Sequence, residues 1–384
     1  MAFDWVSLSC VQQRSRIPSR AILSHNPVLW GFLGDFIYSA SGGTGWGYTT
    51  ATVDKDSTAQ DFLDHYEQLY VTPGFKELFS GVRDFFFMPD DHDYGGGDNW
   101  DWTIAQANSG TSIGAVTQAD VDTHGIRAQQ AAIDVLKNAS GSVFPYAISG
   151  SLGSYTIDSP IVLHDKPSEA AAAASNFEQL YHKIGYDING NRDDSTPYIE
   201  LFFTDCCGAR SPLAEADSAS KYMMGANQEA QFVADVLAST ASFKVWVSVK
   251  KMHTAQYGED NQDVWGGKTP TVPGYETQRD RINLALKDVP GFFVCSGDRH
   301  RGHSIELLEA DVGYDLFDAV GCPTYVEQNA MRLDGSIRSV LNENIYNHFA
   351  VSNGRIDIYQ RDIVTGKALA HCYLTPSDRL PRYP

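Results

Sequence analysis

Acidic side chains directly follow several short apolar segments of this sequence. They are Asp35, Asp90, Asp91, Asp93, Asp205 and Asp298, with His92 and His300 beside two of them. In an open α/β sheet, sites form in the crevice outside the carboxyl ends of the strands, so we expect these side chains to meet. Carboxylates crowded in one cleft repel one another unless cations neutralise them. The pattern therefore favours a metal site, although a single Asp after a strand more commonly caps a helix or a turn.

The donor types narrow the choice of metal ion. Carboxylates mixed with imidazoles suit iron, manganese or zinc, whereas a set made almost wholly of oxygen atoms favours calcium. The six cysteines include no CxxC pair, so neither a zinc knuckle nor a disulfide framework is indicated.

The apolar segments that precede these residues have the length of buried strands, and helical patterns lie between them. The expected strands are 3–8, 28–33, 84–88, 198–204, 243–249 and 291–295, and the expected helices are 118–138, 168–184, 226–240 and 275–289. Later segments, separated by turns such as Asn353-Gly354, are typical of hairpins: 304–308, 348–352, 355–359 and 368–374. Strands that alternate with helices predict a layered α/β fold. With no internal repeat and no long linker, we expect a single domain over 1–384.

Charge and hydropathy exclude several classes of protein. The chain has 384 residues, of which 48 are acidic and 29 basic, giving a formal net charge of −19. A nucleic-acid duplex is not an expected partner, because affinity for phosphate backbones comes mainly from Lys and Arg. No apolar run is long enough for a membrane span. The first ten residues lack the features of a secretory leader, so we expect a cytoplasmic protein as the sequence stands, or an exported one if a leader has been removed.

Three motifs, in chain order, resemble the signatures of the PhoD-type alkaline phosphatases, a family of the calcineurin-like metallophosphoesterases. They are Gly34-Asp35-Phe36-Ile37-Tyr38, Asp90-Asp91-His92-Asp93-Tyr94-Gly95 and Ser296-Gly297-Asp298-Arg299-His300. The likeness extends from Ser9-Cys10 to the segment 346–359, and so spans nearly the whole chain. It implies a four-layer α/β/β/α sandwich with two mixed sheets, a single catalytic domain, and a monomeric enzyme whose substrate is a phosphate ester.

The resemblance also implies a dinuclear metal centre. Fe³⁺ would be held by Cys10, Asp35, Tyr38 and His300. A second site, for one or two Ca²⁺ ions or for Mg²⁺, Mn²⁺ or Zn²⁺ as substitutes, would use Asp35, Asp91, Asp298 and Asp205. Thiolate and phenolate ligands stabilise ferric iron, and a tyrosinate–iron bond should colour the protein. The alternatives are a small buried hydrophobic role for Cys10 and core packing for Tyr38.

Two metal ions about 3.5–4 Å apart can activate a water molecule for in-line attack on phosphorus. His92 is the candidate general acid, held in one tautomer by a carboxylate such as Asp93, and a purely structural histidine is the alternative. Arg210 is the candidate ligand of phosphate oxygens, because a guanidinium offers paired donors. Further contacts to substrate or metal are expected from Asp98, Asn99, Lys250 or His253.

The expected activity is that of a phosphomonoesterase. A phosphodiesterase or phospholipase D-like enzyme with the same metals is the alternative, and a wide cleft lined by aromatic side chains would favour it. The candidates for such a lining are Trp100, Trp102, Trp265 and Tyr275, which could equally pack in the core. A catalytically silent binding protein of the same fold is a third reading, which the three intact motifs disfavour.

Overall fold

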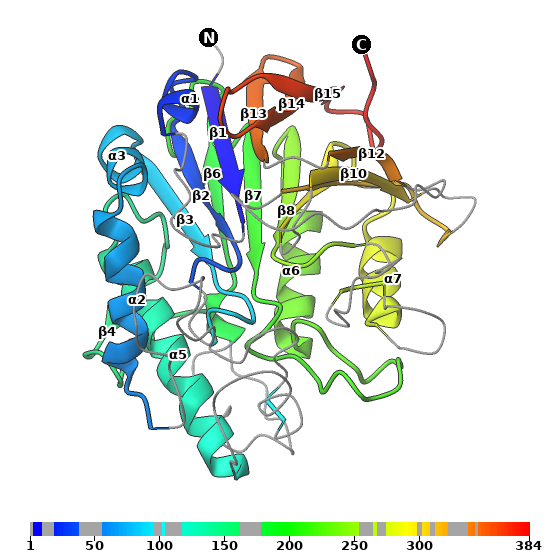
Figure 1. The fold of residues 1–384 in the computed structure, drawn as a ribbon. Helices are drawn as coiled ribbons and strands as arrows, with labels where there is room; N and C mark the ends of the chain where they lie inside the picture. Colours follow the sequence, from blue (N-terminus) through cyan, green and yellow to red (C-terminus); the bar gives the residue numbers. More distant parts are fainter. Residues whose placement is uncertain are drawn as a thin grey trace.

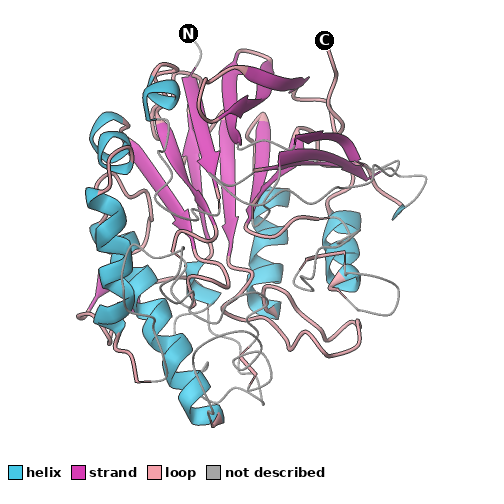
Figure 2. Ribbon diagram, viewed as in Figure 1, coloured by secondary structure: helices cyan, strands magenta, loops and turns pink. Residues whose placement is uncertain are grey.

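The computed structural model describes twelve stretches of the chain. They are residues 3–9, 19–37, 56–94, 102–103, 117–161, 178–252, 264–266, 274–297, 302–307, 312–321, 337–341 and 345–384. Two large sheets lie at the centre of the fold, with helices on both sides of them (Figures 1 and 2).

The first sheet has six strands in the order β15-β14-β13-β1-β2-β3. Its strands are β1 (Phe3–Leu8), β2 (Leu29–Leu33), β3 (Asp84–Met88), β13 (Ile345–Ser352), β14 (Arg355–Asp362) and β15 (Ala368–Leu374). β1, β2 and β3 are parallel, and β13 to β15 add antiparallel pairs. All residues of β2 and β3 are buried, as expected of parallel strands that are covered on both faces.

The second sheet has seven strands in the order β12-β10-β11-β9-β8-β7-β6. Its strands are β6 (His182–Tyr186), β7 (Ile199–Thr204), β8 (Phe243–Ser248), β9 (Phe292–Ser296), β10 (Gly302–Leu307), β11 (Leu316–Val320) and β12 (Ile337–Leu341). β7, β8, β9 and β11 run parallel, whereas β6, β10 and β12 pair antiparallel with their neighbours. A separate two-stranded ladder joins β4 (Ile148–Ser149) to β5 (Thr156–Ile157).

The two sheets pack face to face through aromatic side chains. Phe86 of β3 lies 5.2 Å from Phe203 of β7, and Phe293 of β9 lies 6.3 Å from Phe349 of β13, measured between ring centroids. Aromatic pairs at these separations contribute attraction beyond the area they bury. The core between the sheets therefore fixes how the strand ends of one sheet face those of the other.

Helices cover the outer faces of both sheets. They are α1 (Ser19–Leu23), α2 (Ala59–Val71), α3 (Phe75–Gly81), α5 (Gln118–Asn138), α6 (Ala226–Ala238) and α7 (Glu276–Ala285), with a 3₁₀ turn η2 (Glu178–Leu180). Figure 1 shows α2, α3 and α5 on one side of the strands and α6 and α7 on the other. Thr58 and Thr117 begin α2 and α5 with capping boxes, which satisfy the first backbone donors of each helix.

The predicted four-layer α/β/β/α architecture with two mixed sheets is confirmed. The expected bounds of strands 3–8, 84–88 and 368–374 and of helix 118–138 are those of β1, β3, β15 and α5. The helix expected over 168–184 is wrong in its described part, where residues 178–180 form η2 and His182–Tyr186 form β6. Pairing of β6 with β7 along the sheet edge outweighs local helix propensity there. α2 and α3 were not anticipated, and a single domain over 1–384 stays a prediction.

Among the described helices, none combines the length and the apolar character that crossing a bilayer requires.

Candidate metal centre

The carboxyl ends of the parallel strands are level with one another in both sheets. Leu33 at the end of β2 pairs with Met88 at the end of β3, and Ser248 at the end of β8 pairs with Ser296 at the end of β9. Thr204 ends β7 opposite Ser248. The motif residues that follow these strands consequently leave the sheets at one edge, as the strand-end pattern predicts.

Asp35, Asp91 and His92 come together at this edge. One ligand atom of each lies within 4.8 Å of the others, and all three side chains are buried. Two carboxylates and an imidazole form a mixed oxygen and nitrogen donor set that suits iron, manganese or zinc. These residues therefore fit a metal ion. We call them the Asp35–Asp91–His92 group.

The backbone at Asp35 has an unusual conformation. Asp35 has φ 52° and the preceding Gly34 has φ 80°, so two successive residues occupy the left-handed region. A Cβ atom added at Gly34 would lie 2.7 Å from Oδ2 of Asp90, so a side chain does not fit there. Left-handed backbone at a residue other than glycine is strained and is concentrated at functional sites. The turn directs Asp35 toward the residues that follow β3.

Asp93 connects the turn after β2 with the turn after β3. Its carboxylate accepts hydrogen bonds from the backbone N–H groups of Phe36 (3.3 Å), Ile37 (3.0 Å) and Asp90 (2.9 Å) and from the hydroxyl of Tyr66 (3.1 Å). Burial raises the pKa of Asp93 to about 7, against the opposing effect of these hydrogen bonds. These contacts hold the two turns together, and orientation of His92 by Asp93 stays a prediction.

Lys250 follows β8 of the second sheet and reaches the residues after β3 of the first. Its Nζ lies 2.6 Å from Oδ1 of Asp90 and 2.7 Å from Oδ1 of Asp91, and the Lys250 side chain is 0% exposed. Burial alone would raise the pKa of Asp91, but Lys250, His92 and Arg210 hold that pKa below its usual range. Lys250 thus forms ion pairs with two carboxylates, and the expected contact of Lys250 to substrate or metal stays a prediction.

Asp205, proposed above as a metal ligand, is buried but does not belong to the Asp35–Asp91–His92 group. Its Oδ1 accepts hydrogen bonds from the backbone N–H groups of Cys207 (2.8 Å) and Gly208 (2.9 Å), and its Oδ2 accepts one from the hydroxyl of Tyr94 (3.4 Å). Burial raises the pKa of Asp205 to about 6, although the N–H groups oppose the shift. These contacts describe a turn-stabilising carboxylate, and ligation by Asp205 stays a prediction.

Arg210 and Cys207 lie on the loop after β7, and both are fully buried. The positive charge of Arg210 helps to lower the pKa of Asp91. It also acts on Asp205, where it partly opposes the effect of burial, which raises that pKa. Burial raises the pKa of the Cys207 thiol well above its usual value, so the thiol keeps its proton and donates to Oδ1 of Asp90 at 3.0 Å. The loop thus adds one positive charge and one neutral donor to the centre.

The remaining predicted residues lie outside the described ranges: Cys10, Tyr38, Asp98, Asn99, His253, Asp298 and His300. Two described neighbours show how the motifs converge. A Cβ atom added at Gly297 would overlap the carbonyl oxygen of Leu33 and lie 3.0 Å from Cβ of Ser9. The start of the third motif therefore packs against the end of β2 and against the residue that follows β1, and only glycine fits at position 297.

Three of the aromatic residues considered for a wide cleft belong to the core. Trp102, Trp265 and Tyr275 are at most 1% exposed. Their polar atoms donate to Cys207 O (3.1 Å), Ser248 Oγ (3.3 Å) and Ser211 O (2.7 Å), respectively. The interpretation as a cleft wall is therefore wrong for these three, and Trp100 lies outside the described residues.

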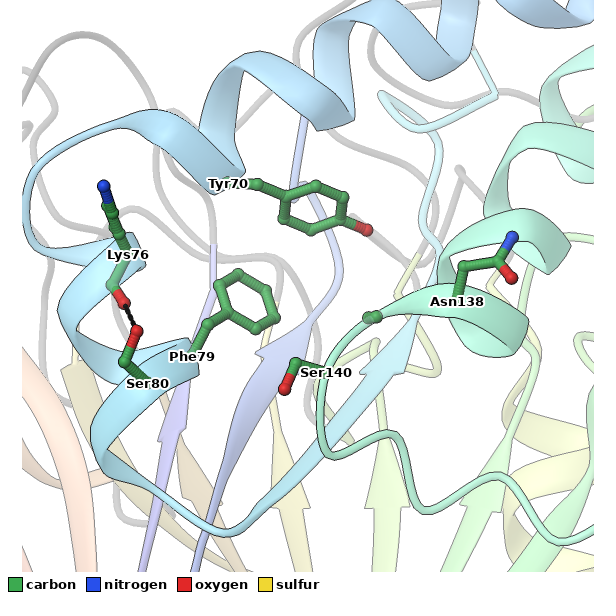
Figure 3. A pocket seen from close by; sticks show the side chains of 7 residues that line it. Tyr70, Lys76, Phe79, Ser80, Asn138 and Ser140 are labelled. Atoms are coloured by element: carbon green, nitrogen blue, oxygen red, sulfur yellow. Dashed lines mark hydrogen bonds between the residues drawn. The ribbon is translucent and has the colours of Figure 1, made fainter.

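A pocket of about 450 Å³ lies elsewhere, between α2, α3 and the end of α5 (Figure 3). Its lining residues are Tyr70, Lys76, Phe79, Ser80, Asn138, Ala139 and Ser140. None of them is a carboxylate, an imidazole or a thiol, and none belongs to the three motifs. We therefore assign the chemistry to the Asp35–Asp91–His92 group and not to this pocket.

Tyr66 was not anticipated as part of the centre, and neither were the contacts that Asp90 makes there. Asp90 stands in the second motif, but its partners Lys250 and Cys207 are more than a hundred residues away in the chain. Tyr66 lies on α2, which had no recognised pattern of its own. The sequence shows Asp90-Asp91 after one apolar strand and Lys250-Lys251 after another. Their spacing along the chain could not predict that Lys250 contacts the two aspartates.

The two mixed sheets with helices on both sides form a metallophosphoesterase-like fold, and buried carboxylates and an imidazole lie at its strand ends. Residues 190–327 match the family model described as PhoD-like phosphatase. The solved structure of PhoD aligns with a TM-score of 0.67 at 16% identity, over 100% of this chain and 71% of that one. The resemblance to the PhoD-type phosphatases is thus confirmed.

A purple acid phosphatase, PPD1 from yellow lupin (Lupinus luteus) seeds, aligns with a TM-score of 0.55 at 8% identity, over 98% of this chain and 54% of that one. At such low identity both structural likenesses show the fold alone. The chain has no significant match among curated protein sequences.

Proposed function

We propose that the chain is a metal-dependent phosphoric ester hydrolase that acts on phosphate monoesters. The observation that carries the proposal is the buried Asp35–Asp91–His92 group at the junction of motifs that resemble those of PhoD-type phosphatases. The family match over residues 190–327 supports the same reaction class independently, because Asp35, Asp91 and His92 all lie outside that range.

Asp35 and Asp91 would hold the metal ion. A metal ion bound there supplies a Lewis acid that lowers the pKa of a water molecule and offsets charge on the phosphoryl oxygens. Fe³⁺ together with Ca²⁺ is the set that the resemblance implies, with Mg²⁺, Mn²⁺ or Zn²⁺ as substitutes. Asp35, Asp91 and His92 offer one ligand atom each, so together they would supply three ligands of one metal ion.

His92 would protonate the leaving alkoxide. One ring nitrogen of His92 lies within 4.8 Å of an oxygen of each carboxylate, and the residue is 8% exposed, so the imidazole would border a substrate that binds at the same edge. The same position would also suit His92 as a third metal ligand. Substitution of His92 would remove the metal ion if His92 is a ligand, and would leave it bound if His92 is only the proton donor. Arg210 would bind phosphoryl oxygens, with a planar pair of donors.

Monoesters are the favoured substrates because Trp102, Trp265 and Tyr275, the described side chains that would have lined a wider cleft, are in the core. The test compares hydrolysis of p-nitrophenyl phosphate with that of bis(p-nitrophenyl) phosphate by the purified protein, before and after treatment with a chelator. We expect faster turnover of the monoester and its loss on chelation. Exclusive cleavage of the diester would contradict the substrate class. Absence of both reactions in metal-replete protein would point to a binding protein of the same fold.

A further inference from the structure

Asp318 is a buried carboxylate of the second sheet that belongs to none of the three motifs. It lies on β11, which pairs with β9, and it is 1% exposed. Its Oδ1 accepts a hydrogen bond from the hydroxyl of Ser296 (2.7 Å), and its Oδ2 accepts one from the backbone N–H of Met252 (3.0 Å). Each oxygen of this carboxylate therefore holds a different segment of the chain.

Both segments lead to residues of the centre. Ser296 ends β9 and begins the third motif, two residues before the expected ligand Asp298. Met252 belongs to the turn after β8 and follows Lys250 by two residues. Nζ of Lys250 lies 2.7 Å from Oδ1 of Asp91. Asp318 thus links the start of the third motif to the turn that presents Lys250 to the first sheet.

Other buried groups hold the turn after β8 from different sides. The hydroxyl of Ser248 accepts a hydrogen bond from the Lys250 N–H (3.2 Å) and donates one to the Lys250 carbonyl (2.8 Å). Arg279 of α7 donates to the carbonyl of Met252 at 3.0 Å. These contacts tie the turn to β8 and to α7, whereas the contact with Asp318 ties it to β9 and β11.

Asp318 is the counterpart in the second sheet of Asp93 in the first. Each carboxylate is buried, and each accepts backbone N–H groups from a turn at the carboxyl ends of the strands. Burial raises the pKa of Asp318 to about 6, and the hydrogen bonds from Ser296 and Met252 and the positive charge of Lys251 oppose that shift. The carboxylate is therefore a strong acceptor placed where two turns of the centre need one.

From these contacts we propose that Asp318 is a positioning residue of the centre, which keeps the start of the third motif and the Lys250 turn in fixed places. The inference rests on the proposed function and deepens it, because it names the contact that arranges the second sheet's side of the site. Hydrogen-bond partners that lie behind the ligands of a metal site typically change metal affinity or activity about 10–100-fold when they are lost.

Two substitutions separate the link from the charge. Asp318→Leu has a similar volume and no acceptor, so both segments lose their partner. Asp318→Asn keeps an oxygen for the Met252 N–H, and its amide can donate to the Ser296 hydroxyl, so the link persists without the charge. We expect Asp318→Leu to weaken Mn²⁺ binding about tenfold in calorimetric titrations and to lower kcat for p-nitrophenyl phosphate, with KM little changed because Asp318 is buried. Asp318→Asn should stay close to the wild type in both.

Hydrogen exchange measures the link without reference to catalysis. Loss of the acceptor frees the Met252 N–H, so peptides that cover 249–252 and 292–297 should exchange faster together in Asp318→Leu and at the wild-type rate in Asp318→Asn. Asp84→Leu is the matched control. Asp84 is a buried carboxylate at the opposite end of β3, where it accepts a hydrogen bond from the hydroxyl of Tyr186 at 2.9 Å. Its loss should change neither Mn²⁺ affinity, nor kcat, nor exchange in these two segments.

Faster exchange in Asp318→Leu with wild-type Mn²⁺ affinity and kcat would overturn the inference, because the link would then position nothing that the centre uses. Should Asp318→Leu not fold, Ser296→Ala removes one of the two contacts. We expect it to weaken Mn²⁺ binding and lower kcat to a smaller extent, and wild-type values would overturn the inference.

The outcome is separable from that of the proposed function. Weaker Mn²⁺ binding by Asp318→Leu, with no hydrolysis by the wild type, would sustain the role of Asp318 and reject the enzyme. Hydrolysis by the wild type, with every value unchanged in folded Asp318→Leu, would do the reverse.

Discussion

The most direct test of how the centre is built is to remove the carboxylate of Asp93. Asp93→Ala leaves four buried donors without their acceptor: the N–H groups of Phe36, Ile37 and Asp90 and the hydroxyl of Tyr66. A buried donor that loses its partner costs about 1–3 kcal/mol. Four donors at the lower end of this range give a loss of about 4 kcal/mol in the free energy of unfolding. That is a large share of the roughly 5–15 kcal/mol that stabilises a typical domain.

The assay is urea unfolding followed by circular dichroism, with Tyr66→Phe as the matched control. Tyr66→Phe removes one of the four donors and leaves the carboxylate in place, so we expect a loss of about 1 kcal/mol. Because Asp93 joins the turns that carry Asp35 and Asp91, Asp93→Ala should also lower metal content and the rate of hydrolysis. If Asp93→Ala destabilised the protein less than Tyr66→Phe, the carboxylate would not be what holds the two turns together.

Three further predictions concern the ligands, the proton donor and acid stability. Asp35→Asn should lose bound metal and activity together, and full metal content by elemental analysis with a wild-type rate would exclude Asp35 as a ligand. His92→Ala should keep its metal and slow esters with poor leaving groups most; loss of the metal would instead make His92 a ligand. Burial lowers the pKa of His182 to about 4, so only the unfolded state binds this proton between about pH 6.5 and 4, and stability falls as the pH falls through that window. His182→Phe should therefore lose about 3 kcal/mol less between pH 7 and pH 4 in unfolding titrations, and a pH dependence equal to that of the wild type would refute this.

The sequence predicted best those elements whose pattern is local. β3 is a run of apolar residues between turns, and α5 has a capping Thr117 with regular apolar spacing, so both have the expected bounds. The segment His182–Tyr186 is short and mixed, and it becomes a strand only through pairing with β7. The neighbouring strand β7 ends at Thr204, as expected. Local propensity decides an element when the segment is long, and tertiary pairing decides it when the segment is short.

For the centre, the positions of carboxylates were predictable and their partners were not. Asp35, Asp91 and His92 meet as strand-end placement suggested. The use of Asp93 as an acceptor for backbone donors could not be read from the sequence, because it depends on the left-handed turn that brings Phe36 and Ile37 to it. Residue type indicates what a side chain can bind, but hydrogen-bond partners depend on backbone geometry.

The charges of the centre come from both sheets. The carboxylates of the Asp35–Asp91–His92 group follow β2 and β3 of the first sheet, whereas the cations Lys250 and Arg210 follow β8 and β7 of the second. Lys250 and Asp91 are 159 residues apart in the chain, and they meet only when the two sheets pack face to face. Breaking one partner of a buried ion pair leaves an uncompensated charge, which is strongly destabilising. Packing of the sheets and charge balance of the centre are therefore coupled, so a substitution in the aromatic core between the sheets should weaken metal binding as well as folding.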